Sequence, residues 1–230
     1  MFDRPHHNRV ARILEAFDGG LLAQSCCYFG GGTAIALRYG EFRESVDIDL
    51  LVSDRGGYGS LRERVHQARS INALTIHPLT ELRVPITDQY GVRTIVEVDS
   101  EPIKVEIVAE GRIELEHPAA HDEICGITTL TELDMATTKL LANSDRWTDT
   151  AVHARDLIDL AMMEPSADLF HLAVSKAETA YRSSVITDLT RAIGYLRDNP
   201  RRLDEYMTAL SMHTTAPAVL WQRISRLQRI

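Results

Sequence analysis

The sequence comprises 230 residues, and its 25 lysines and arginines against 33 aspartates and glutamates give a formal net charge of −8. Hydrophobic residues make up 44% and charged residues 25% of the chain, which is typical of a globular protein and excludes a disordered one. The acidic balance argues against nonspecific binding along nucleic acids, which depends on neutralising phosphates, but it leaves room for a local basic site.

No stretch approaches 18 consecutive apolar residues, and the first ten residues lack the apolar segment of a secretory signal. We therefore expect a cytoplasmic protein with no membrane partner. The three cysteines, Cys26, Cys27 and Cys125, form no CxxC pair, which is typical of reduced thiols inside the cell.

The first part of the chain is expected to alternate helices and strands. Apolar residues at near-helical spacing predict an interrupted helix over residues 8–24. Residues 26–29 predict a buried strand that runs into glycines, and residues 33–39 a short helix with Thr33 as its N-cap. Residues 46–52 predict a second strand, because acidic and apolar residues alternate at its start.

The remaining elements divide the chain into two parts. Residues 55–60 predict a glycine-rich turn and residues 61–73 a helix, and strand-like runs follow over residues 74–77, 92–98 and 103–108. Helical patterns then cover residues 130–143, 151–163, 169–181, 186–198, 203–212 and 217–230. We predict an α+β protein, with an α/β domain over residues 1–127 and a helical domain packed on it over residues 128–230.

Two carboxylates in the second predicted strand indicate a metal site. Side chains alternate faces along a strand, so Asp47 and Asp49 are expected on one face and Val46, Ile48 and Leu50 in the core. A divalent cation removes the repulsion between paired carboxylates, and Mg²⁺ takes such ligands together with phosphate oxygens. The alternative is a solvated acidic face without a ligand.

Glycines upstream of these aspartates predict a phosphate-binding loop. Gly31 and Gly32 allow backbone amides to approach a triphosphate closely, and Thr33 begins a helix whose N-terminus favours anions. The hydroxyl of Ser45 either adds to this phosphate site or bonds locally to the backbone. The alternative for the glycines is a tight turn between a strand and a helix.

A third carboxylate is available on a later strand. Residues 103–108 alternate so that Glu106 and Lys104 share the polar face. If this strand neighbours the one with Asp47, Glu106 is a metal ligand or the base for an incoming hydroxyl. Alternatively it pairs with Lys104, and Glu97 and Asp99 are its rivals.

These residues resemble a known family. A glycine loop, an Asp-x-Asp pair and a later acidic residue on a strand resemble the nucleotidyltransferase superfamily. More closely, Gly31-Gly-Thr-Ala-Ile-Ala-Leu37 followed by Arg43-Glu-Ser-Val-Asp-Ile-Asp-Leu50 is similar to the AbiEii/AbiGii toxin family. That family supplies toxins of type IV toxin–antitoxin and abortive-infection systems. The resemblance implies a nucleotidyltransferase fold, with a small mixed sheet flanked by helices and a C-terminal helical bundle.

The second half of the chain carries further parts of the resemblance, which covers roughly residues 28–163. Residues 133–146 resemble the family's helix with a functional lysine, which corresponds to Lys139. Residues 151–160 resemble its following Arg-Asp-x-x-Asp-Leu helix, which implies Asp156 as a functional acid and Asp159 as the second choice.

Elementary chemistry gives these residues roles. Lys139, Asn143 and Arg146 share a helix face, where a lysine can neutralise triphosphate charge. Asp156 either fixes that lysine by a salt bridge or contacts the nucleotide. Asp159 follows Arg155 by four residues, so its alternative is a surface ion pair of a few tenths of a kcal/mol. The C-terminal arginines form either a solvated helix face or a contact with a tRNA backbone.

We therefore expect a nucleotidyltransferase that depends on Mg²⁺, or on Mn²⁺, and transfers a nucleoside monophosphate from a nucleoside triphosphate to a hydroxyl. The resemblance implies a tRNA 3′ end as acceptor, a toxin function and a cognate antitoxin partner; a protein acceptor is the alternative. The rival functions are an inactive nucleotide- or partner-binding module of this fold, and a small-molecule nucleotidyltransferase.

Overall fold

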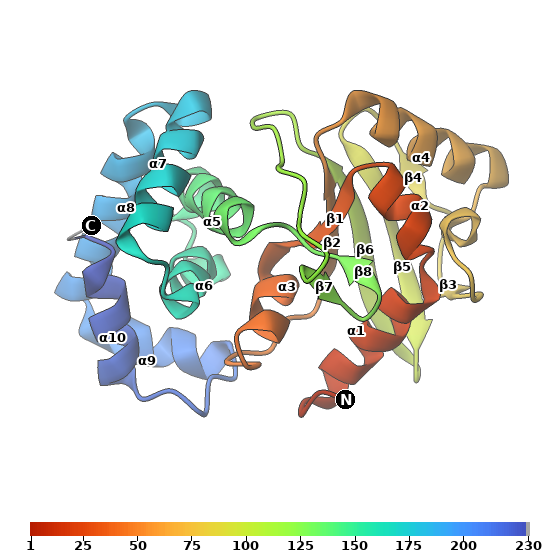
Figure 1. Cartoon of the computed structure of the whole chain (residues 1–230). Helices are drawn as coiled ribbons and strands as arrows, with labels where there is room; N and C mark the ends of the chain where they lie inside the picture. Colours follow the sequence, from red (N-terminus) through yellow and green to blue (C-terminus); the bar gives the residue numbers. More distant parts are fainter. Residues whose placement is uncertain (229–230) are drawn as a thin grey trace. The chain divides into compact units, whose positions relative to one another are not determined.

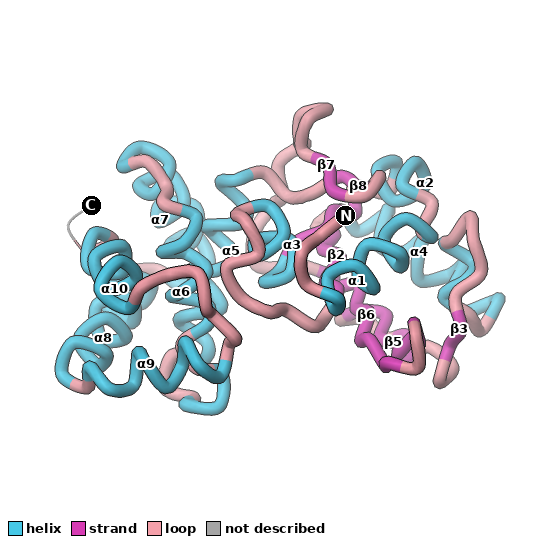
Figure 2. Tube along the Cα trace, turned by 90° about the horizontal axis from the view of Figure 1, so that it is seen from below, coloured by secondary structure: helices cyan, strands magenta, loops and turns pink. Residues whose placement is uncertain are grey.

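The computed structural model describes residues 1–228, which form two compact units (Figure 1). The first unit contains Met1–Arg38 and Ser45–Thr131, and the second contains Tyr39–Glu44 and the chain from Glu132 onward. The strands lie in the first unit, whereas the second is built from helices and their connections, as the colouring by secondary structure shows (Figure 2).

The first unit combines short helices with a mixed sheet. Its helices are α1 (Pro5–Ala16), α2 (Gly19–Gln24), α3 (Gly31–Arg38) and α4 (Arg55–Ala68), and a 3-10 turn spans Ile71–Leu74. Its strands are β1 (Cys27–Gly30), β2 (Ile48–Val52), β3 (Thr80–Glu81), β4 (Ile86–Thr87), β5 (Gly91–Val98), β6 (Glu101–Ala109), β7 (Glu123–Ile124) and β8 (Ile127–Thr128). The predicted α+β class with a small mixed sheet is confirmed.

The main sheet has the strand order β1-β2-β6-β5-β3, and β4 also pairs with β5. Strands β2 and β6 are parallel, and the other pairs of this sheet are antiparallel. Strands β7 and β8 form a separate hairpin. The parallel pair places two strands that are far apart in the sequence, and their acidic residues, side by side.

Alternation along the strands gives the sheet one apolar face. On β6, Ile103, Val105 and Ile107 are at most 1% exposed, whereas Lys104 and Glu106 are half-buried on the other face. Burying one such aliphatic side chain stabilises the fold by about 1.5–3 kcal/mol. This confirms the alternation predicted for residues 103–108 and places Glu106 outside the hydrophobic core.

Strand β2 begins later than its sequence predicts. The strand starts at Ile48, and Val46, which we expected in the core, is 48% exposed. The carbonyl of Asp47 accepts a hydrogen bond from the hydroxyl of Thr33 instead of joining the sheet. Asp47 therefore lies in the connection that precedes the strand, and only Asp49 lies within it.

The expected glycine-rich turn at residues 55–60 is wrong, because these residues form the beginning of α4. The side chain of Asp54 caps this helix by accepting from the Gly57 N–H at 2.5 Å. A Cβ atom at Gly57 would lie 2.1 Å from the carbonyl oxygen of Ser25. The glycine thus allows the helix to pack closely against the end of α2.

The expected strand at residues 74–77 is also wrong. Ile71–Leu74 form the 3-10 turn, and the chain beyond it contributes an isolated bridge between Thr75 and Phe17. The turn is held by local hydrogen bonds, in which the Ser70 side chain accepts from the Asn72 N–H. Of the two apolar residues in the predicted strand, Leu74 is buried by the turn, whereas Ile76 is 62% exposed.

The second unit contains the helices that the sequence predicts, with boundaries that differ by a few residues. Within the described chain they are α5 (Glu132–Arg146), α6 (Arg155–Met163), α7 (Ala167–Tyr181), α8 (Ser184–Asp198), α9 (Pro200–Ala209) and α10 (Pro217–Arg226). A 3-10 turn at Thr150–Val152 precedes α6. The last two residues of the helix predicted over 217–230 lie outside the described residues.

One segment from the first half of the sequence packs in this helical unit. Tyr39–Glu44 connects α3 to β2, yet Phe42 is only 2% exposed and the Tyr39 hydroxyl donates to Glu132 at 3.1 Å. The Glu44 N–H donates to the carbonyl of Leu210 at 3.1 Å. The connection is therefore a structural part of the helical unit.

None of the helices between residues 1 and 228 is both long enough and apolar enough to span a membrane.

The packing of α4 generates a first prediction. Gly57→Ala is expected to lower the free energy of unfolding by about 1–3 kcal/mol, because the new methyl group overlaps a backbone carbonyl that cannot rotate away. Gly59→Ala, in the same helix with no atom within 4 Å of the added Cβ, is the matched control. It should raise that free energy by about 0.4–1 kcal/mol. Urea unfolding of both variants measures the difference, and equal effects would contradict the assigned packing.

Candidate functional site

The glycine loop lies directly against one of the predicted metal ligands. Gly31 follows β1 with φ +68°, a backbone conformation that favours glycine. A Cβ atom added to it would lie 2.2 Å from Asp49 Oδ2. Gly30 and Asp49 are partners in the antiparallel pairing of β1 and β2. The pairing of β1 with β2 thus brings the glycine loop next to Asp49. The approach is so close that only a residue without a side chain fits at position 31.

The parallel pairing of β2 and β6 brings a second carboxylate beside Asp49. Asp49 and Glu106 are partners in the register, and Glu106 is in turn paired with Arg93 of β5. Neighbouring strands lie about 4.8 Å apart, and side chains of paired residues point to the same face. Glu106 also accepts a hydrogen bond from Lys104 Nζ at 2.6 Å. Glu106 therefore lies next to Asp49 in the sheet and also forms the ion pair with Lys104 that was its predicted alternative.

The two predicted phosphate-binding hydroxyls hold the chain before β2. Thr33 is inside α3 and only 1% exposed, so its predicted position as N-cap is wrong; the helix begins at Gly31. Its hydroxyl donates to the Asp47 carbonyl and lies 2.8 Å from Ser45 Oγ. The Ser45 N–H donates to His7 Nε2 at 3.2 Å. These bonds fix the backbone on which Asp47 is carried.

The carboxylates fit a hard cation in their chemistry but do not by themselves enclose one. Within residues 1–228, no group of three or more His, Cys, Asp or Glu side chains is arranged to hold a metal ion. Asp49 and Glu106 are neighbours, whereas Asp47 lies one residue before the strand. Mg²⁺ binds through one or two carboxylates and completes its shell with waters and substrate phosphates. Asp49 and Glu106 therefore match, in number and chemistry, the carboxylates that a protein supplies to Mg²⁺.

The second unit holds the other two predicted residues in a buried ion network. Lys139 on α5 lies between two carboxylates of α6, with Nζ 3.0 Å from Asp156 Oδ1 and 2.7 Å from Asp159 Oδ2. Arg146 binds Asp156 through Nε at 2.7 Å and through its terminal nitrogen at 2.9 Å. Arg43 binds Asp159 in the same bidentate way, at 2.6 and 2.9 Å.

The network fixes the charge of Asp156. Burial alone would raise the pKa of this carboxyl, but the charge of Lys139 and the hydrogen bonds from Arg146 hold the pKa well below its ordinary value of 3.8. Asp156 is therefore ionised at neutral pH and provides a permanent counter-charge for Lys139. This geometry matches the expected role of Asp156 in holding the lysine.

Two members of the network differ from the sequence-based expectation. Asp159 is fully buried, so its alternative as a surface ion pair with Arg155 is wrong. Arg43 was not singled out, because a lone arginine in a connection has no periodicity that indicates burial. The only signal was its position in the motif that ends in Asp47 and Asp49, and its partner Asp159 is 116 residues away in the sequence.

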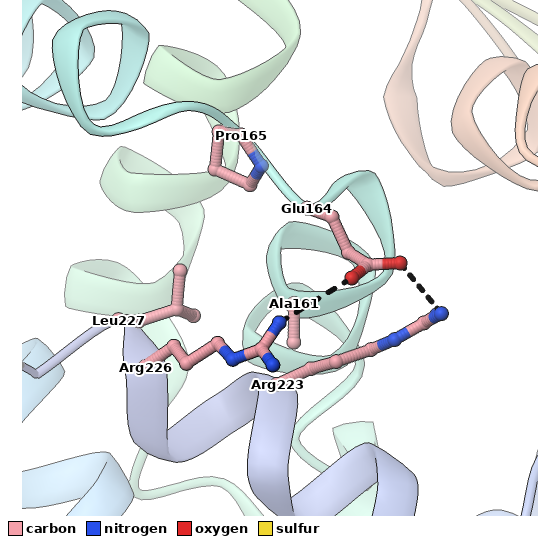
Figure 3. Close-up of a pocket in the computed structure, with 6 residues that line it drawn as sticks. All are labelled: Ala161, Glu164, Pro165, Arg223, Arg226 and Leu227. Carbon is pink, nitrogen blue, oxygen red and sulfur yellow. Dashed lines mark ion pairs between the residues drawn. The ribbon is translucent and has the colours of Figure 1, made fainter.

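The C-terminal arginines lie in a different part of the helical unit. Arg223 and Arg226 line a cavity of about 120 Å³ together with Ala161, Glu164, Pro165 and Leu227 (Figure 3). Glu164 forms ion pairs with both arginines, with Arg223 at 2.5 Å and with Arg226 at 3.8 Å. Their charge is thus partly neutralised within the protein, which favours the structural interpretation of these residues over a contact with RNA.

Comparison with known proteins gives an independent result. The model of the family described as nucleotidyl transferase AbiEii toxin, type IV toxin–antitoxin system, matches residues 12–226. No curated protein matches the chain significantly in sequence.

Two crystal structures of Helicobacter pylori proteins share the fold. A protein described as a candidate nucleotidyltransferase is similar with a TM-score of 0.53 and 16% identity, over 97% of this chain and 93% of its own. JHP933 is similar with a TM-score of 0.51 and 14% identity, over 100% of this chain and 94% of its own. At such identities the likeness establishes the fold.

The contact between Gly31 and Asp49 generates a second prediction. Gly31→Ala is expected to destabilise the protein by more than the roughly 1–2 kcal/mol of a left-handed residue, because the methyl group also displaces the Asp49 carboxylate. Gly126→Ala is the matched control, since Gly126 has φ +78° and no atom within 4 Å of an added Cβ. Urea unfolding should show a larger loss for Gly31→Ala, and equal losses would contradict the contact.

The low pKa of Asp156 generates a third prediction. Folding lowers the pKa of Asp156, so its ionised carboxyl stabilises the folded protein at any pH above the pKa it has in the unfolded chain. This stabilisation is lost as the pH falls from that value toward the lower pKa of the folded protein. Asp156→Asn should therefore lower the free energy of unfolding by about 3–5 kcal/mol at pH 7, because buried cations lose their partner. The difference from wild type should shrink as the pH falls below about 4.

The control for this measurement is Glu205→Gln, which removes an exposed pair with Arg202. It should leave the unfolding free energy nearly unchanged, because water screens the attraction in an exposed pair. Urea unfolding at several pH values measures both variants. A difference between wild type and Asp156→Asn that stays constant down to pH 3 would show that the carboxyl is not stabilised in its ionised form.

Proposed function

Because the chain belongs to the AbiEii family of nucleotidyl transferase toxins of type IV toxin–antitoxin systems, we propose that it transfers a nucleoside monophosphate from a nucleoside triphosphate to a hydroxyl acceptor. The observation that carries this proposal is the packing of the Gly31 backbone against Asp49, with Glu106 next in the register. The turn that we propose binds phosphate then lies beside two carboxylates on the adjoining strands β2 and β6.

The first unit binds the reacting end of the nucleotide in this proposal. The amides of Gly31 and Gly32, at the N-terminus of α3, bind phosphate oxygens, because this end of a helix favours anions. Asp47 and Asp49 hold Mg²⁺, or Mn²⁺ in its place, with Glu106 as a further ligand. When bound, the cation neutralises phosphate charge that builds up during transfer. Thr33 and Ser45 support the Asp47 backbone, and their hydroxyls remain candidates for phosphate binding.

The second unit supplies Lys139. Its ammonium group, held by Asp156, binds the triphosphate and balances the negative charge of the leaving group. Asp156 acts through the lysine, since its carboxylate oxygens are already occupied by Lys139 and Arg146.

The transfer itself is a single displacement at phosphorus. The acceptor oxygen forms a bond to the α-phosphorus, the bond from that phosphorus to the bridging oxygen breaks, and pyrophosphate leaves with the electron pair. In the alternative role to that of a metal ligand, Glu106 takes the proton of the acceptor hydroxyl, and its position beside Asp49 in the register supports this role. In this role it would exchange its bond with Lys104 for one with the acceptor.

For the acceptor we propose a tRNA 3′ end in the cytoplasm, so that blocked aminoacylation arrests growth. The family's place in type IV toxin–antitoxin systems supports the toxin role and a cognate antitoxin. The charge of −8 requires local recognition of the RNA end rather than broad contact with its backbone. A protein or a small molecule as acceptor, and a module that binds nucleotide without transfer, are the alternatives that the experiments separate.

The acceptor is identified by labelling. The protein is incubated with each α-³²P nucleoside triphosphate, Mg²⁺, total RNA and total protein, and the products are separated by gel electrophoresis. We expect label in the tRNA band and release of pyrophosphate, with both abolished by a chelator and restored by Mg²⁺ or Mn²⁺. Label in protein would identify a different acceptor. Calorimetric binding of a nucleotide without pyrophosphate release would support the inactive module instead.

Removal of one metal-binding carboxylate generates a fourth prediction. Asp49→Asn should reduce nucleotidyl transfer by at least about 100-fold, because the amide is a poor ligand and leaves phosphate charge uncompensated. The fold should be retained, since the Asp49 side chain is only half-buried. Glu101→Gln, an exposed carboxylate at the far end of β6, is the control and should keep full activity. Full activity of Asp49→Asn would exclude the proposed metal site.

A further inference from the structure

Helix α5 carries a buried donor that the protein itself does not satisfy. The side-chain nitrogen of Asn143 has no hydrogen-bond partner among the described residues, although Asn143 is only 3% exposed. Buried polar groups are nearly always paired, because a donor that leaves water without a new acceptor loses free energy. An unpaired amide at this depth therefore indicates an acceptor that the chain does not supply.

The position of Asn143 indicates what that acceptor is. Asn143 lies four residues after Lys139 and three before Arg146, so the three side chains share one face of α5. Lys139 and Arg146 both bind Asp156. The unsatisfied amide thus lies beside a cluster of cations, where the acceptor that fits is an anion.

Three cationic side chains surround two carboxylates in this cluster. Arg43, Lys139 and Arg146 all bind Asp156 or Asp159. Each carboxylate is bound by two cations. The ammonium group of Lys139 has three N–H donors and two carboxylate partners. The side chain of Arg146 is 35% exposed, which gives the cluster an opening to solvent.

We propose that the side-chain amide of Asn143 donates a hydrogen bond to a phosphate oxygen of the substrate, next to Lys139. Asn143 is then a substrate-binding residue of the helical unit, in addition to those assigned above. This inference rests on the proposed nucleotidyl transfer. The phosphate belongs to the nucleoside triphosphate or to the RNA acceptor, and the two sources are separated experimentally.

The test compares stability with substrate affinity, because loss of a substrate-binding residue lowers the affinity without lowering the stability. Asn143→Leu is similar in size and removes the unpaired donor, so the urea midpoint should be unchanged or higher than that of wild type. At the same time the KM for its phosphate ligand should rise about tenfold or more, because a hydrogen bond to a charged group is lost. The kcat should change less than KM, since the contact is already made in the bound substrate.

Binding measurements identify the source of the phosphate. Calorimetry of the full chain compares three probes with Mg²⁺ present: inorganic tripolyphosphate, a non-hydrolysable nucleoside triphosphate and total tRNA. Weaker binding of the first two by Asn143→Leu assigns the contact to the nucleotide. Weaker binding of tRNA alone assigns it to the acceptor. Unchanged binding of all three, or a lower urea midpoint with unchanged affinity, overturns the proposal.

Two further variants complete the design. Ser144→Ala removes another buried side-chain atom without a partner, from a residue roughly 100° around the helix from Asn143. It should leave KM unchanged. Asn143→Asp keeps the shape of the side chain and places a carboxylate where the phosphate binds. It should therefore weaken phosphate binding more than Asn143→Leu does. It also serves as the test if the leucine variant does not fold. Wild-type protein that releases no pyrophosphate would count against the proposed function, whereas an active wild type with an unaffected Asn143→Leu counts only against this inference.

Discussion

The close approach of the Gly31 backbone to the Asp49 carboxylate is the constraint on which the first unit depends. It follows from the antiparallel pairing of β1 with β2, in which Gly30 and Asp49 are partners. The turn after β1 must reverse into α3 with φ +68°, and it must do so with no side chain between the backbone and the carboxylate. A single glycine satisfies both conditions. Gly31 therefore allows the N-terminus of α3 to lie directly beside Asp49 of β2.

The second unit solves a different physical problem, the burial of charge. Five ionised side chains share the interior around α5 and α6, and the bidentate geometry of Arg43 and Arg146 satisfies both carboxylates. Burying such ions is costly unless each has partners, so the arrangement tolerates few substitutions. As a result, Lys139 is held in one position between two carboxylates. A cation fixed in this way can balance negative charge that develops on a phosphate group.

The two units are linked through the sequence between α3 and β2. Tyr39–Glu44 belongs to the helical unit, while Ser45 and Asp47, only a few residues later, belong to the first. Arg43 thus contributes to the ion network on one side of this short connection, and the hydroxyls of Thr33 and Ser45 fix the backbone on the other. Family membership assigns the overall chemistry. The contacts of Arg43 and Ser45 show that one short stretch of chain carries residues of both units.

The sequence determined what short-range patterns encode: the two-residue alternation of β6, the helices of the second half, and the motif that identifies the family. It failed where a contact with a distant segment overrides the local pattern. Thr33 caps no helix because its hydroxyl holds the Asp47 carbonyl, and the glycines of α4 form a helix because Gly57 packs on Ser25. The partnership of Asp49 with Glu106 and the burial of Arg43 with Asp159 were decided by tertiary structure alone. Register and burial depend on residues dozens of positions apart, and no periodicity in a single segment records them.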